Sequence, residues 1–153
     1  MNSNTKMICF DMDGTIADFY GVDNWLDYLN HESCKPYTEA QPLCDMNKLN
    51  EVCELLRSAG WEINIITWLS KNASKEYKKA IRLAKREWLN KWGFVYDHFH
   101  GVQYGTPKTK CVRRRAIKAI LIDDDKRVRQ KWNLGEVVNP VEINIIDFLE
   151  NLL

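Results

Sequence analysis

The short apolar runs of this chain each stop abruptly at polar residues, and helical patterns separate one run from the next. Lys6 to Phe10 runs directly into Asp11, Trp61 to Thr67 is followed by polar residues, and Ala119 to Ile122 stops at Asp123. Apolar runs of this length are typical of buried strands. Buried strands that alternate with helices predict a parallel sheet with helices on both faces, which is a three-layer α/β/α, Rossmann-like fold.

The spacing of apolar residues predicts the helices between these strands. The clearest helix is Ala73 to Trp92, which carries an apolar stripe at helical spacing. Asp45 and Gly60 are the expected N-cap and C-cap of another helix. Shorter helices are predicted over residues 20–31, 109–115, 125–132 and 143–153, further strands over 99–104 and 136–138, and a loop over 32–45.

Length and composition predict one soluble domain over residues 1–153. With 153 residues, of which 45% are hydrophobic, the chain is long enough to bury a single core. It contains no run of eighteen apolar residues, so we expect no membrane span. The polar start, Met1 to Lys6, is unlike a signal peptide. Five scattered cysteines are typical of reduced thiols, and together these features predict a cytoplasmic location.

Polar clusters follow the strands at the points where a parallel sheet binds its ligands. Ligands of open α/β sheets bind at the carboxyl ends of the strands. The residues found there are the carboxylates of Asp11 and Asp13, a hydroxyl from Thr67, a lysine at 108, and the run Asp123 to Asp125. Carboxylates bind Mg²⁺, and a hydroxyl and a lysine can hold phosphate oxygens. This set favours phosphoryl transfer that uses a metal.

The same residues resemble the motifs of a known family. Phe10-Asp11-Met12-Asp13-Gly14-Thr15 resembles the first motif of the haloacid dehalogenase (HAD) superfamily of phosphatases. Thr67 resembles the second motif, Lys108 the third, and Ile122-Asp123-Asp124 the paired-aspartate form of the fourth. The matches run in the family order from residue 7 to about residue 125. The resemblance implies a HAD-like fold and an Mg²⁺-dependent phosphomonoester hydrolase.

The resemblance also implies a role for each motif residue. Asp11 would be the nucleophile that forms an aspartyl-phosphate, and Asp13 would be the general acid and base. The carboxylate of Asp11, the backbone carbonyl of Asp13 and the side chain of Asp124 would hold Mg²⁺. The phosphoryl group would be bound by Thr67 and Lys108.

The residues leave some of these placements open. Lys110 lies two residues after Lys108 and could take its role, and Asp123 or Asp125 could replace Asp124 as the metal ligand. We prefer Asp124 by analogy with the family, with Asp123 as a residue that orients the metal site. For Asp125 we favour a helix cap. A calcium-binding EF-hand loop is excluded, because Cys9 and Tyr20 would then occupy two ligand positions.

The size of the cap and the residues around the fourth motif indicate which substrates the site could take. Residues 18–45 allow at most a small helical cap or flap, so we expect an open site. Leu121 to Asp124 and the helix after them resemble the deoxyribonucleotidases and the 3′-phosphatase domain of polynucleotide kinase. A nucleotide is therefore the expected substrate, and a nucleic-acid end is the alternative. Trp68 is either a core residue or a wall that stacks on a base.

Three further questions stay open in the sequence. A non-catalytic binding module can have the same fold, although the complete motif set argues against it. Transfer of the phosphoryl group to an acceptor other than water also fits the motifs. The sequence does not determine the oligomeric state.

The net charge of +1 conceals two halves of opposite sign. Residues 1–66 hold four basic and eleven acidic residues, whereas residues 67–153 hold eighteen basic and ten acidic residues. The basic charge concentrates over Lys71 to Lys91 and Lys108 to Lys118. A polyanionic substrate is therefore not excluded, and its attraction would be local to these segments.

Overall fold

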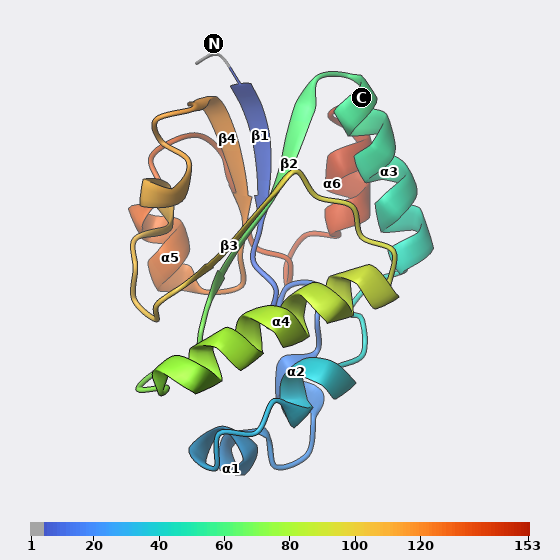
Figure 1. Cartoon of the computed structure of the whole chain (residues 1–153). Helices are drawn as coiled ribbons and strands as arrows, with labels where there is room; N and C mark the ends of the chain where they lie inside the picture. The colour runs from blue at the N-terminus through green and yellow to red at the C-terminus, as the bar shows by residue number, and fades with distance from the viewer. Residues whose placement is uncertain (1–4) are drawn as a thin grey trace.

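A five-stranded parallel sheet forms the centre of the computed structural model, which describes residues 5–153 apart from the side chain of Ile117 (Figure 1). The strand order is β3-β2-β1-β4-β5, and every pair of neighbours is parallel. The strands are β1 (Thr5–Phe10), β2 (Trp61–Trp68), β3 (His98–Val102), β4 (Ala116–Ile122) and β5 (Val137–Val138). This arrangement confirms the predicted parallel α/β sheet.

Helices cover both faces of the sheet. The side chains of β1 point alternately to the two faces, and on each face they belong to a different hydrophobic cluster. Ile8 and Phe10 belong to a cluster that includes residues of α3, α4 and α6, whereas Met7 and Cys9 belong to one that includes residues of α5. Figure 1 shows α3 and α6 on one side of the sheet and α5 on the other. The helices are α1 (Trp25–Asn30), α2 (Lys35–Glu39), α3 (Met46–Ser58), α4 (Lys75–Lys91), α5 (Lys126–Lys131) and α6 (Ile145–Glu150). The three-layer prediction is confirmed.

Side-chain caps fix where the two longest helices begin. The carboxylate of Asp45 accepts a hydrogen bond from the backbone N–H of Lys48 at 3.2 Å, which confirms the predicted cap of α3. The hydroxyl of Ser74 accepts from the backbone N–H of Tyr77 at 3.1 Å. Such caps satisfy a donor that has no partner within the helix. Because Ser74 is the cap, α4 begins two residues after the predicted start at Ala73.

Two predicted segments differ from the structure. The loop predicted over residues 32–45 contains α2, in which Pro36 lies in the first turn. A proline is tolerated there because its missing N–H would have no helical partner. The helix predicted over residues 109–115 is only a 3₁₀ turn over Lys108–Cys111. The 3₁₀ turn ends at Val112, whose φ of −131° and ψ of −13° are not helical, and residues 112–115 form turns. The strand β4 then begins three residues before the predicted one.

The segment over residues 18–45 lies beyond the carboxyl ends of the strands and beside α4 (Figure 1). Its two ends are joined to each other by backbone hydrogen bonds. The N–H of Asp18 donates to the carbonyl of Gln41 at 2.7 Å, and the N–H of Leu43 donates to the carbonyl of Ile16 at 2.8 Å. Tyr37 of α2 packs in one hydrophobic cluster with residues of α4. The two ends of this segment therefore lie side by side, next to the loop after β1.

Two further features of the structure concern the cysteine side chains and the lengths of the helices. All five cysteines are free thiols, and burial raises the pKa of the Cys9 thiol to about 12. Across residues 5–153, the helices are too short or too polar for any one of them to span a bilayer.

Candidate active site

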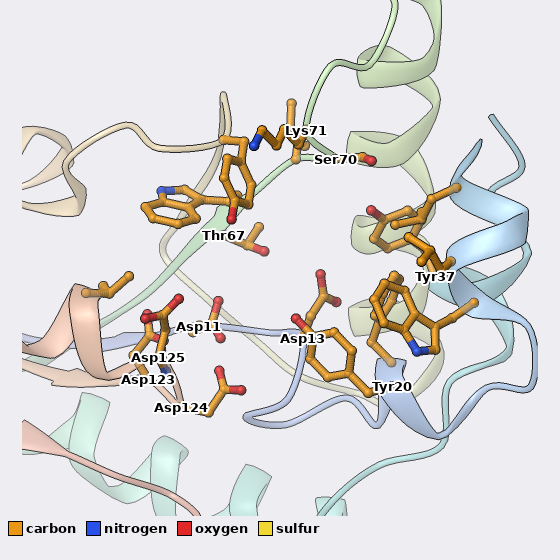
Figure 2. Close-up of a pocket in the computed structure, with 18 of the residues that line it drawn as sticks. Asp11, Asp13, Tyr20, Tyr37, Thr67, Ser70, Lys71, Asp123, Asp124 and Asp125 are labelled. Carbon is orange, nitrogen blue, oxygen red and sulfur yellow. Dashed lines mark hydrogen bonds between the residues drawn. The ribbon is translucent and has the colours of Figure 1, made fainter. Parts of the chain in front are cut away.

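The carboxyl ends of three neighbouring strands bring the predicted site residues together. Asp11 follows the central strand β1, Thr67 lies near the end of β2, and Asp124 comes two residues after β4. They line one cavity of about 630 Å³ (Figure 2). The cavity is also lined by the other site residues named from the sequence, which are Asp13, Trp68, Lys108, Asp123 and Asp125.

Lys108 is the lysine that reaches the carboxylates. Its side chain is 3% exposed, and its Nζ lies 3.0 Å from Oδ1 of Asp11 and 2.7 Å from Oδ2 of Asp123. Burial disfavours the ammonium, but the two carboxylates outweigh burial and raise the pKa of Lys108 above its ordinary value. Lys110, the alternative, is exposed to solvent. The structure therefore places Lys108 at the site.

Three carboxylates crowd the floor of the cavity. One oxygen from each of Asp11, Asp123 and Asp124 lies within 4.8 Å of the others. Burial, followed by repulsion from Asp11, raises the pKa of both Asp123 and Asp124 above the ordinary aspartate range. Lys108 supplies one positive charge against three carboxylates. A divalent cation with a preference for oxygen ligands, such as Mg²⁺, would offset the remaining charge, so the donor set fits such an ion.

The two neighbouring aspartates differ in how many of their oxygens are already bonded. In Asp123, Oδ2 accepts from Lys108, and Oδ1 accepts from the backbone N–H of Asp125 at 2.9 Å. Among the described residues, the carboxylate of Asp124 receives only a long contact of 3.4 Å from the hydroxyl of Thr15, and its other close polar neighbour is the carboxyl group of Asp11. That hydroxyl is closer, at 3.0 Å, to Oδ2 of Asp11. Asp124 is thus the member of the pair that retains free oxygens for a cation.

Asp125 serves as the helix cap that the sequence favoured. Its Oδ1 accepts from the backbone N–H of Arg127 at 2.8 Å at the start of α5. The guanidinium of Arg127 also pairs with its carboxylate at 3.0 Å. These contacts account for both oxygens of Asp125 and hold the pKa of this carboxyl below its ordinary value.

Gly14 is the residue that allows Asp124 to approach the loop after β1. Its φ of +82° lies in the left-handed region, which a glycine adopts without steric cost. A Cβ at this position would clash with Oδ2 of Asp124 and would also touch the Tyr20 ring at 3.2 Å. Two separate reasons therefore require glycine at this position: the positive φ angle and the close approach of the Asp124 side chain.

Substituting Gly14 with Ala is expected to lower catalysis by about 10²-fold, because the methyl group displaces Asp124 from its place. The strained φ should cost about 1–2 kcal/mol of stability. Gly60→Ala is the matched control, since Gly60 has a φ of +96° with no atom within 4 Å of the added Cβ. Thermal unfolding and phosphate release should show a similar loss of stability in both variants and a loss of activity in Gly14→Ala alone. Equal activities would contradict the assigned role of Gly14.

Lys85 is a site residue that the sequence analysis missed. It lies on α4, is 1% exposed, and its Nζ contacts Oδ2 of Asp13 at 3.0 Å, the backbone carbonyl of Trp68 at 2.9 Å, and the hydroxyl of Thr67. The sequence analysis considered the basic residues of this helix only together, as a local concentration of positive charge. The available signal was helical phase, because Lys85 lies four residues after Ile81 and three before Trp88, on the buried face.

Aromatic side chains form two walls above the polar floor. On one side, Nε1 of Trp68 donates to the carbonyl of Thr106 at 2.8 Å, and the Trp68 ring packs 4.9 Å from that of Tyr104. Trp68 is half-buried and lines the cavity, so its indole is not enclosed in the core. The opposite wall comes from residues 18–45, and Figure 2 shows Tyr20 and Tyr37 across from Thr67. The sequence analysis did not assign that wall a role.

Comparison with solved structures identifies the fold. The HAD domain of the effector protein Lem4 from Legionella pneumophila superposes with a TM-score of 0.52 at 14% identity, covering 98% of this chain and 94% of that one. This chain has a HAD-like fold. The predicted resemblance to this superfamily is confirmed at the level of the fold.

A second neighbour belongs to a larger assembly. A chain of the Pnkp1/Rnl/Hen1 RNA repair complex matches with a TM-score of 0.56 and 14% identity, covering 87% of this chain. The match covers 43% of that longer chain. No family model matches the HAD-like chain, and no curated protein sequence does so.

Proposed function

We propose that the chain is an Mg²⁺-dependent phosphomonoester hydrolase that acts through an aspartyl-phosphate on Asp11. One observation carries this proposal: buried Lys108 holds Asp11 against Asp123, with Asp124 close by, on the floor of an accessible cavity. The HAD-like fold places such a cluster at the edge of the sheet where α/β proteins bind their ligands. In the proposed single domain, residues 18–45 form a small cap beside this site.

The metal would be held by the carboxylates of Asp11 and Asp124 and by the backbone carbonyl of Asp13. When bound, it supplies positive charge that offsets both the carboxylates and the phosphoryl oxygens. Asp123 orients the site through its bonds to Lys108 and to the backbone of Asp125. Lys108 and the hydroxyl of Thr67 bind the phosphoryl oxygens.

The first step transfers the phosphoryl group to the protein. An oxygen of Asp11 attacks phosphorus and forms an acyl phosphate while the bond from phosphorus to the leaving oxygen breaks. Asp13 donates a proton to that leaving oxygen. Burial raises the pKa of the Asp13 carboxyl above its ordinary value, which favours the protonated form that a general acid needs.

The second step returns Asp11 to its carboxylate form. Asp13, now ionised, accepts a proton from water as the water oxygen attacks phosphorus. The bond from phosphorus to the Asp11 oxygen breaks, and inorganic phosphate leaves. Asp13 is thereby protonated again for the next cycle.

The aromatic wall of Trp68 and Tyr104 supports a nucleotide as the substrate. Base stacking on an aromatic side chain contributes about 1–3 kcal/mol. Replacing Trp68 with Ala is therefore expected to raise KM for a nucleoside monophosphate by roughly 5- to 150-fold. KM for p-nitrophenyl phosphate, which has no base, should change little. Steady-state kinetics on both substrates test this, and equal increases in the two KM values would count against stacking.

A nucleic-acid end is the second candidate substrate, and the charge distribution favours it. Residues 67–153 hold eighteen basic residues against ten acidic ones, and Lys71 and Arg127 from this part line the cavity. The RNA repair complex among the structural neighbours points to the same class. The deciding assay compares kcat/KM for a deoxynucleoside monophosphate and a 3′-phosphorylated oligonucleotide. Steep salt dependence is expected only for an oligonucleotide substrate, because only a polyanion releases many counterions.

A further inference from the structure

Lys85 places a second buried ammonium at the active site, separate from the one on Lys108. It comes from the middle of α4 and passes between the loop after β1 and the end of β2. Its three N–H donors meet three acceptors, which are a carboxylate oxygen of Asp13, the hydroxyl of Thr67 and the backbone carbonyl of Trp68. The ring of Tyr37 covers it, with its centroid 5.2 Å from Nζ. The ammonium is therefore fully paired and enclosed.

The contact with Thr67 determines the direction of the threonine hydroxyl. A hydroxyl has one hydrogen to donate and two lone pairs that accept. Because Lys85 has no acceptor, its N–H must donate to Oγ1 of Thr67. The hydroxyl hydrogen cannot point back at the ammonium, so it is available to a phosphoryl oxygen in the cavity that Thr67 lines.

The contact with Asp13 selects one of the two carboxyl oxygens for proton transfer. Oδ2 of Asp13 is 3.0 Å from Nζ of Lys85, whereas Oδ1 makes no hydrogen bond with the described residues. Figure 2 shows Asp13 and Thr67 directed into the same space beside Asp11. Oδ1 is thus the oxygen that can meet the leaving group, and Lys85 fixes the carboxyl in this orientation.

We propose that Lys85 is a positioning residue that aligns the general acid Asp13 with the phosphate-binding Thr67. This inference rests on the proposed function. In the step concerned, the proton moves from Oδ1 of Asp13 to the leaving oxygen while the phosphorus–oxygen bond breaks. Lys85 takes no part in this proton transfer. Its contribution therefore grows with the need of the leaving group for a proton.

The test compares two leaving groups in the variant Lys85→Met, which keeps an unbranched apolar chain in place of the lysine stem and removes the ammonium. A nucleoside monophosphate has an alkoxide leaving group that requires a proton, whereas p-nitrophenolate leaves without one. We expect kcat/KM to fall by about 10²-fold or more for the nucleotide and by less than about tenfold for p-nitrophenyl phosphate. The ratio of the two values is independent of the fraction of folded enzyme. Lys79→Met, on the exposed side of the same helix, is the control and should leave the ratio unchanged.

Lys85→Gln is measured in parallel because the apolar variant leaves Asp13 without its partner. It retains an N–H donor without the charge and should lie between wild type and Lys85→Met in the ratio. An equal loss on both substrates, or failure of both variants to fold by circular dichroism, would overturn the positioning role in favour of a structural one. Absence of Mg²⁺-dependent hydrolysis by the wild type would instead overturn the proposed function, and this inference with it.

Discussion

Substituting Asp11 with Asn is expected to remove Mg²⁺-dependent phosphate release almost completely, by about 10³-fold or more. The amide has nearly the shape of the carboxylate but is not a nucleophile, so no acyl phosphate can form. Lys108 keeps Asp123 as a partner at 2.7 Å, so the variant should remain folded. The measurement is single-turnover phosphate release, together with acid-quench trapping of labelled phosphate on the protein.

An exposed aspartate provides the matched control for this substitution. Asp23 lies on the surface of the segment over residues 18–45, so Asp23→Asn should retain wild-type activity and wild-type labelling. Retention of Mg²⁺-dependent activity by Asp11→Asn would show that the covalent mechanism is wrong. Labelling of the Asp11→Asn protein at the wild-type level would show that the phosphoryl group is carried elsewhere.

Removal of the metal with EDTA is expected to abolish activity and to make stability depend on pH. Burial and repulsion from Asp11 raise the pKa of Asp123 and Asp124 in the folded protein. The unfolded chain has ordinary aspartates with a pKa of about 3.9. The folded state therefore binds more protons, and the free energy of unfolding of the metal-free protein falls as the pH rises above about 4.

Adding Mg²⁺ should reverse this loss, because the cation favours the ionised carboxylates. We expect Mg²⁺ to raise Tm more at about pH 8 than at about pH 5, since the raised pKa values lie above that of an unfolded aspartate. In Asp124→Asn the Mg²⁺-dependent rise in Tm should largely disappear, while Asp125→Asn should lose only its ion pair with Arg127 and keep that rise, because asparagine also caps a helix. A Tm that responds to Mg²⁺ equally at both pH values would contradict the carboxylate cluster as its binding site.

The sequence predicted the sheet and the floor of the site because both depend on local patterns. The apolar and buried residues of β1 run from Met7 to Phe10, so the position of Asp11 at the carboxyl end of the strand follows from where that run stops. The central place of β1 then puts Asp11 between the residues that follow β2 and β4.

The choice between residues in irregular or basic segments needed the structure. Lys108 and Lys110 lie in a 3₁₀ turn without a repeating pattern, so their spacing does not show which one points inward. Lys85 is one of many basic residues on α4. Helical phase places it on the buried face, but its contacts with Thr67 and Tyr37 depend on how α4 packs against the rest of the chain. The missed helix α2 is five residues long, which is too short for apolar periodicity to show.

Because the two ends of residues 18–45 are bonded to each other, this segment can change in length or sequence without altering the sheet. Since the backbones at residues 16–18 and 41–43 bond to each other, the chain between them begins and finishes at almost one point. Insertions between these points would lengthen a loop that is already closed, at a small cost in entropy. They would leave the strand register, and hence the position of Asp11 directly after β1, unchanged. Related chains could therefore differ in the substrates that fit against residues 18–45 and still share the same arrangement of carboxylates.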